Sequence, residues 1–231
     1  MNKFTLPTFM GAAIVASVMI GLSGQAVAGI SATKHNLSDT GTGDINSDNP
    51  EICVFCHTPH NAIKNNNIPL WNHTLSATAS YGVYTSPSFD ASGTVADVGG
   101  ADQSSATVTN LCLSCHDGTV ALNAMNNPSN SHLVTVMAGA GQTAGAISAG
   151  RATNLGADLT NDHPVNFTFD AALYAADPTL NDPSTLTDVR LFNETVQCAS
   201  CHDPHESDPT TQPFLRFTMD GSGLCLKCHN K

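Results

Sequence analysis

The chain has 231 residues, of which only 12% are charged and 6% are aromatic, and its formal net charge is −11. So acidic a chain lacks the basic surface that binds nucleic-acid phosphates or an anionic membrane, and we expect no nucleic-acid partner. One Trp, three Tyr and nine Phe residues leave few large side chains to fill a core. Another source of apolar bulk is therefore predicted.

Residues 1–28 have the pattern of a secretory signal peptide. Lys3 is followed by an apolar run from Phe9 to Leu22, and Ala26 and Ala28 form an A-x-A cleavage site. The run is shorter than the roughly 20 apolar residues of a transmembrane helix, and no membrane span is expected. We predict an exported protein, extracellular or at the cell surface, with the periplasm as the alternative.

The mature chain, residues 29–231, is predicted to be mostly coil. Polar or small residues dominate three stretches and give no helical period, although we allow for a short helix in the last: 29–50, 76–110 and 137–156. Alternation at 165–169 predicts a short strand. Residues 189–192 and 195–197 predict a hairpin that leads into Cys198.

All eight cysteines belong to C-x-x-C-H motifs, and the motifs are numbered here in chain order. Motifs 1 to 4 are Cys53–His57, Cys112–His116, Cys198–His202 and Cys225–His229. Two cysteines three residues apart lie on one side of a helical turn, where they can form thioethers with the two vinyl groups of a haem. The following histidine can then bind the iron. Structural zinc and disulfides also use paired cysteines, but neither explains a histidine after every pair.

The motifs therefore predict four c-type haems, each with its iron, and assign twelve residues to them. The thioether positions are Cys53, Cys56, Cys112, Cys115, Cys198, Cys201, Cys225 and Cys228. The proximal iron ligands are His57, His116, His202 and His229. The haems would supply the missing apolar bulk, so the predicted fold class is haem-organised and mostly coil, with a few short helices and short β-hairpins, as a multihaem cytochrome c.

Motifs 1 and 3 continue alike, with a proline and then a second histidine, His60 or His205. Each is followed by a simpler motif, which suggests a weak two-haem repeat over 29–135 and 160–231 within one tetrahaem domain. A histidine three residues after the proximal ligand cannot reach the far face of the same iron. We expect His60 and His205 to bind instead the iron of the other haem in their own two-haem unit.

Six histidines outside the motif positions are available for the four distal positions. Besides His60 and His205, the favoured distal ligands are His163, which Pro164 braces before the predicted strand, and His35. His73 and His132 are expected not to bind iron. A methionine thioether is the alternative ligand, disfavoured by the surplus of imidazole.

The chain resembles the multihaem c-type cytochromes with paired C-x-x-C-H motifs, most closely the four-haem extracellular cytochromes of metal-reducing bacteria that polymerise into conductive filaments. The likeness rests on these segments: 34–37, 53–61, 69–72, 112–119, 162–165, 198–205, 213–216 and 225–231. It implies two-histidine ligation of each iron and a continuous chain of haems through successive subunits. The implied partners are further copies of the chain, redox cytochromes and metal-oxide acceptors.

The function predicted is electron transfer through low-spin haems, not enzymatic catalysis, as a subunit of an extracellular filament. The alternatives are a monomeric periplasmic shuttle, or a multihaem reductase with one open iron, which the surplus of histidine disfavours. His35 lies on a polar N-terminal arm that could fold back on its own haem or reach a neighbouring subunit. The resemblance to the filament cytochromes implies the second, in which His35 completes a haem across the subunit boundary.

Overall fold

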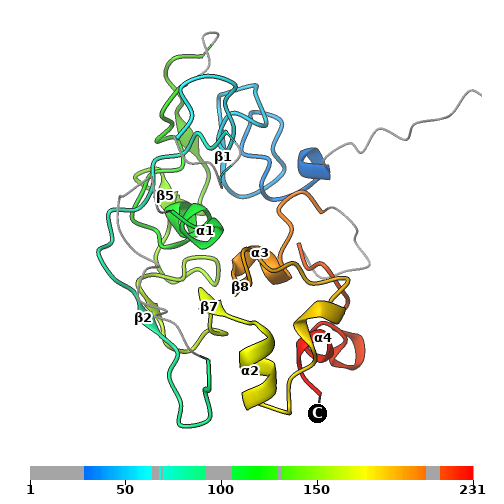
Figure 1. Cartoon of the computed structure of the whole chain (residues 1–231). Coiled ribbons are helices and arrows are strands. Elements are labelled where there is room, and N and C mark those ends of the chain that lie inside the picture. The colour runs from blue at the N-terminus through cyan, green and yellow to red at the C-terminus, as the bar shows by residue number, and fades with distance from the viewer. Residues whose placement is uncertain are drawn as a thin grey trace, which may run out of the picture.

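The computed structural model describes residues 29–63, 68, 70–91, 106–128, 132–206 and 214–230. The predicted signal peptide lies outside these described residues. Most of the described chain is coil and turn, interrupted by short helices and paired two-residue strands (Figure 1). The prediction of a mostly coil chain with few short helices and short strand pairs is confirmed, while its organisation by haem stays a prediction.

The helical elements are all short, and the longest, α1, spans nine residues. In chain order they are η1 (Gly29–Ala32), α1 (Val108–His116), α2 (Ala171–Ala176), η3 (Pro183–Thr185), α3 (Cys198–Cys201), η4 (Asp220–Ser222) and α4 (Cys225–Cys228). Motif 2 ends α1, and motifs 3 and 4 begin with α3 and α4. Motif 1 forms a turn in which the His57 N–H donates to the Cys53 carbonyl at 2.8 Å. The turn that the motif spacing predicts is therefore present.

The strands form four separate two-stranded sheets in the described chain. Antiparallel pairs join β1 (Asn46–Ser47) to β3 (Met137–Ala138), β4 (Gln142–Thr143) to β5 (Ala146–Ile147) and β7 (Phe167–Thr168) to β8 (Thr195–Val196). The parallel pair joins β2 (Gly82–Val83) to β6 (Asp158–Leu159). The expected strand at 165–169 is present as β7.

Two local expectations need correction. The stretch 137–156 contains no helix but β3, β4 and β5, because Gly139 and Gly145 take positive φ angles of 99° and 86° and turn the chain there. The hairpin before Cys198 is reduced to a single bridge between Phe192 and Thr195. The strand β8 takes β7 as its partner instead, with Val196 opposite Phe167.

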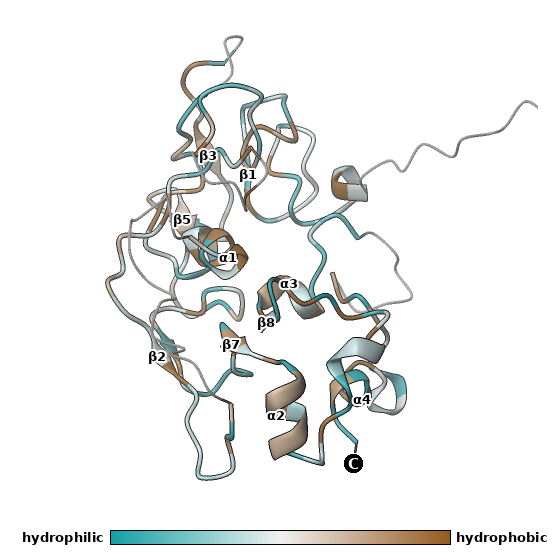
Figure 2. Cartoon of the chain, in the orientation of Figure 1, coloured by the Kyte–Doolittle hydropathy of each residue, from teal (hydrophilic) through white to brown (hydrophobic). Residues whose placement is uncertain are grey.

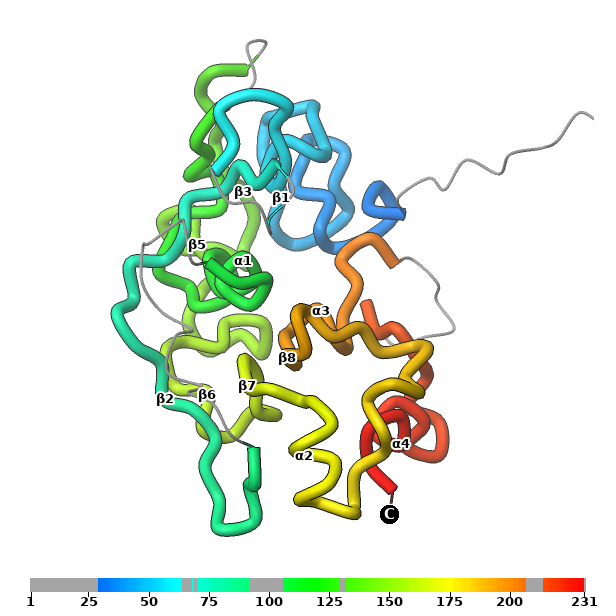
Figure 3. The backbone as a smooth tube through the Cα atoms, in the orientation of Figure 1, coloured from blue at the N-terminus to red at the C-terminus, as the bar shows by residue number. Residues whose placement is uncertain are grey.

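Helices α1 and α3 pack together near the middle of the molecule, where Figure 3 shows them side by side. The Cys198 N–H donates to Thr109 Oγ1 at 3.3 Å, and the Thr109 N–H donates to Gln197 Oε1 at 3.3 Å. These bonds hold the start of motif 3 against the helix that carries motif 2. They also link the two predicted repeat units directly.

The hydrophobic core is divided into small clusters, and Figure 2 shows apolar residues scattered along the coil. One cluster gathers Leu75 and Leu111 around Trp71, a second centres on Phe167 and Phe169, and a third consists of Leu113 and Leu159 with partly buried neighbours. No helix among the described residues is long and apolar enough to cross a membrane.

Buried asparagines tie loops together where regular structure is sparse. The side chain of Asn72 is fully buried, and its amide donates to the carbonyl oxygens of Val54 at 2.6 Å and Asn127 at 3.0 Å. Its own oxygen accepts from the Asn127 N–H at 2.8 Å. Asn72 thereby fastens motif 1 to the loop that follows motif 2.

We predict that Asn72→Ala lowers the free energy of unfolding by about 2–4 kcal/mol, because three buried backbone groups lose their partner. Thermal unfolding of the haem-loaded protein measures the change. The control is Asn161→Ala, since Asn161 is exposed and its side chain makes no hydrogen bond with the described residues. Equal stability of the two variants would contradict the role given to Asn72.

Candidate haem-binding site

Six of the ten histidines face one another in three pairs, and all ten lie in the described part of the chain. Every pair joins a motif histidine to a histidine outside the motif positions. The pairs are His57 with His205, His116 with His35, and His229 with His163, and their ring centres are 6.1, 6.1 and 6.4 Å apart. Each motif histidine so paired therefore has one imidazole opposite it.

The spacing of these pairs fits two axial ligands of one iron. With a metal–nitrogen bond of about 2.0 Å and about 1.2 Å from nitrogen to ring centre, two imidazoles on opposite faces of a metal have centres about 6.4 Å apart. Rings in direct stacking lie closer, as His35 and Phe214 do at 4.3 Å. Among the described residues no group of three or more His, Cys, Asp or Glu converges as a zinc site would require.

Hydrogen bonds orient two of the paired imidazoles, and a carboxylate lies near a third. Nδ1 of His116 lies 2.8 Å from the Thr153 carbonyl oxygen, and Nδ1 of His163 lies 2.9 Å from that of Pro164. Nδ1 of His205 lies 3.4 Å from a carboxylate oxygen of Asp203. An acceptor at Nδ1 holds the proton on that nitrogen and leaves the lone pair of Nε2 for a metal, which is the usual arrangement of metal-binding histidines.

His35 differs from these three histidines because one of its ring nitrogens has no hydrogen-bond partner among the described residues. This nitrogen, Nδ1, is buried. Burial and the neighbouring His116 lower the pKa of His35 to about 4. The ring is therefore neutral at pH 7, and only a neutral imidazole can bind a metal.

The other three histidines outside the motif positions are not brought against a motif histidine by any ring contact in the structure. His73 is buried, with its ring nitrogens 2.9 and 3.0 Å from the carbonyl oxygens of Thr74 and Ala121. His132 places Nε2 3.0 Å from Asp48. His60, expected to be a distal ligand, is exposed. The fourth motif histidine, His202, is also exposed and has no ring contact with another histidine in the described chain.

The structure places two of the expected distal ligands next to motif histidines other than those expected. His205 was expected to serve the second two-haem unit, but it faces His57 of motif 1. His35 was expected to reach a neighbouring subunit, but it faces His116 of its own chain. The reason is that the N-terminal arm folds back, with the Gly29 N–H donating to the His205 carbonyl at 3.1 Å. In Figure 3 the start of the arm accordingly lies beside the segment that follows α3.

The four motifs follow one another in space as they do along the chain. Burial and the Cys115 thiol raise the pKa of Cys56 to about 12, which places motif 1 beside motif 2. The Cys112 thiol is hydrogen-bonded to Cys198, and this contact raises the pKa of Cys112. Burial and the nearby Cys201 raise the pKa of Cys228 to about 11. Motif 3 thus lies between motifs 2 and 4.

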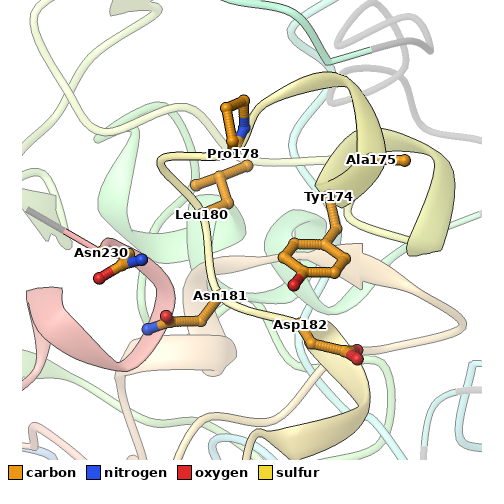
Figure 4. Close-up of a pocket in the computed structure, with 7 residues that line it drawn as sticks. All are labelled: Tyr174, Ala175, Pro178, Leu180, Asn181, Asp182 and Asn230. Carbon is orange, nitrogen blue, oxygen red and sulfur yellow. The ribbon is translucent and has the colours of Figure 1, made fainter.

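A hollow of about 330 Å³ lies beside motif 4, between α2 and the C-terminal segment (Figure 4). Its lining residues are Tyr174, Ala175, Pro178, Leu180, Asn181, Asp182 and Asn230. The Asp182 carboxylate accepts from the Ser184 N–H at 2.8 Å and so caps η3. The Asn181 N–H donates to the Cys228 carbonyl at 2.8 Å. Asn181, a residue that lines the hollow, therefore helps to hold α4 in place.

Some of the groups that contact the paired histidines could not be predicted from the sequence. The Thr153 carbonyl could not be assigned to His116, because every residue has a carbonyl and 37 positions separate the two. Trp71, whose ring meets that of His57 edge-on at 6.1 Å, could be recognised only as a residue suited to a core. Asp203 is the exception, since an acidic residue next to a motif histidine can be noticed.

Residues 192–231 match the family described as the doubled CXXCH motif. No curated protein matches the chain. The matched segment contains motifs 3 and 4, and it supports a multihaem c-type cytochrome with covalently bound haem and a role in electron transfer.

We predict that His35→Ala, His163→Ala or His205→Ala each converts one low-spin haem to a high-spin or water-ligated haem, because each removes one imidazole of a pair. Low-temperature electron paramagnetic resonance of the haem-loaded variants reports the change. His132→Ala is the control and should stay low-spin. A high-spin signal from the control, with none from the three other variants, would overturn the pairing.

Proposed function

We propose that this protein carries electrons through four covalently bound c-type haems, three of them held between the imidazole pairs. The observation that carries the proposal is the uniform spacing of the pairs, 6.1 to 6.4 Å, each with one motif histidine. When bound, such haems supply reversible one-electron chemistry at the iron. The chain contributes attachment at the cysteines and two imidazole nitrogen ligands for each of these three irons.

Two imidazoles per iron suit electron transfer better than catalysis. With both axial positions taken by the protein, no position is left for a substrate, and little need move when the charge changes. The hydrogen bonds to Nδ1 of His116 and His163, and the Asp203 carboxylate 3.4 Å from Nδ1 of His205, hold the rings in place. The sequential order of motifs 1 to 4 favours a single file of redox centres.

The haem count has a direct test. Protein matured with a c-type attachment system should retain four haem masses after denaturation. The double change Cys112→Ala and Cys115→Ala should remove one of them, because a thioether needs the cysteine sulfur. Intact-mass spectrometry gives the count, with the double change Ser86→Ala and Ser88→Ala, at an exposed turn, as the control. Retention of four haems without the motif 2 cysteines would refute attachment there.

The proposal extends to a filament of this chain outside the cell, exported by the signal peptide expected at residues 1–28. Within the described residues, His202 has no ring contact with another histidine, and His60 is exposed, with a ring that makes no hydrogen bond, ion pair or ring contact. We assign His60 of one subunit to the iron at His202 of the next. A coordinate bond at a repeating head-to-tail contact extends a polymer without closure. It can also hold together subunits whose net charge of −11 would separate them.

His60→Ala should then shorten or abolish filaments, and each subunit should contain one haem that is no longer low-spin. Electron microscopy and paramagnetic resonance measure these two effects, with His132→Ala as the matched histidine control. A monomeric wild-type protein with every haem low-spin would favour the periplasmic shuttle. A monomer with one high-spin haem that binds nitrite would favour the reductase instead.

A further inference from the structure

A buried carboxylate directly follows the iron ligand of motif 2. Asp117 is the C-cap residue of α1, one position after His116, and is only 3% exposed. A carboxylate is unfavourable at the C-terminal end of a helix, where the backbone carbonyls already concentrate partial negative charge. The position therefore has to stabilise this anion by other means.

Hydrogen-bond donors surround the Asp117 side chain. One carboxylate oxygen accepts from Tyr81 at 2.6 Å, from Thr78 at 3.1 Å and from Ser76 through a short bond. The other oxygen accepts from the N–H and the hydroxyl of Thr119 at 2.9 and 2.8 Å. All five bonds are donated to the carboxylate, whereas a protonated carboxyl group would have to donate one itself, so this set of partners fits the ionised form. Asp117 is thus an anion at neutral pH.

This anion has no neutralising cation in contact with it. No Lys or Arg side chain bonds to Asp117 in the described part of the chain. The ring of His73, which interacts electrostatically with Asp117, is buried, and burial lowers its pKa, so it is neutral. Tyr81 is neutral too, because burial and Asp117 raise its pKa to about 12. The charge of Asp117 is therefore offset only by dipoles.

The corresponding residue of motif 3 is paired. Asp203 follows His202 just as Asp117 follows His116, but Arg216 Nη1 lies 3.0 Å from its carboxylate. Thr58 and Asn230, which follow the other two motif histidines, carry no charge. Among the four motifs, only motif 2 has a buried and uncompensated charge beside its iron ligand.

We propose that Asp117 sets the reduction potential of the motif 2 haem and makes it the last of the four to accept an electron. The proposal rests on haem attachment at motif 2, which is part of the proposed function. A nearby negative charge stabilises ferric over ferrous iron, and its effect is strong where burial excludes water. One interior centre of the single file thereby differs in potential from its neighbours.

The test is a spectroelectrochemical titration of the haem-loaded Asp117→Asn variant. The lowest of the four midpoint potentials should rise by about 59 mV. For a one-electron couple this corresponds to an equilibrium constant for reduction that is about tenfold larger. Asp158→Asn is the matched control, because Asp158 also accepts from the N–H and hydroxyl of a threonine two residues on but is exposed. Its shift should be less than a third as large, since water screens the charge.

A second variant separates charge from structural damage. Tyr81→Phe removes one donor and keeps the carboxylate, so the lowest potential should stay or fall; loosening of the packing alone would move both variants alike. Haem mass is measured first. Absence of haem from motif 2 would refute the proposed function, whereas four attached haems with an unmoved lowest potential in Asp117→Asn would refute only the role of Asp117.

Discussion

Most of this chain is coil, so its buried backbone groups must find partners outside helices and sheets. Short polar side chains supply many of them, and Asn36, Asn49 and Asn72 are at most 1% exposed. An amide both donates and accepts, so a single asparagine can join two loops as a short strand pair would. Asn72, for example, joins motif 1, which contains His57, to the loop after motif 2.

The imidazole pairs link parts of the chain that lie far apart in sequence. In each pair the ring centres are 6.1 to 6.4 Å apart, and His35 keeps a buried nitrogen without a hydrogen-bond partner among the described residues. Leaving such a group unsatisfied costs free energy that a metal bond would recover. The hydrophobic clusters are small and separate, so the polypeptide alone provides little apolar core to stabilise the fold. Folding and haem attachment are therefore expected to depend on each other.

The local features of the site could be predicted from the sequence, and the long-range ones could not. The attachment motifs depend on a spacing of three residues, which the helical turn at α3 or α4 satisfies by itself. The pairing of His205 with His57 depends on how the intervening loops are arranged, and no periodic pattern encodes that. Asp117 and Asp203 look equivalent in the sequence, and only the position of Arg216 distinguishes them. The strands of 137–156 were missed because the glycine turns outweigh helix-favouring alanines.

The contact between the N-terminal arm and the segment after α3 has a practical consequence for purification. Any tag placed before Gly29 would begin beside His205, whose carbonyl accepts from the Gly29 N–H, and His205 faces His57. An oligohistidine tag there would bring surplus imidazoles to a position where the proposed ligation uses one imidazole. A tag after the last residue would start close to His229 and carry the same hazard. An affinity handle without histidine avoids competition with the chain's own ligands at both ends.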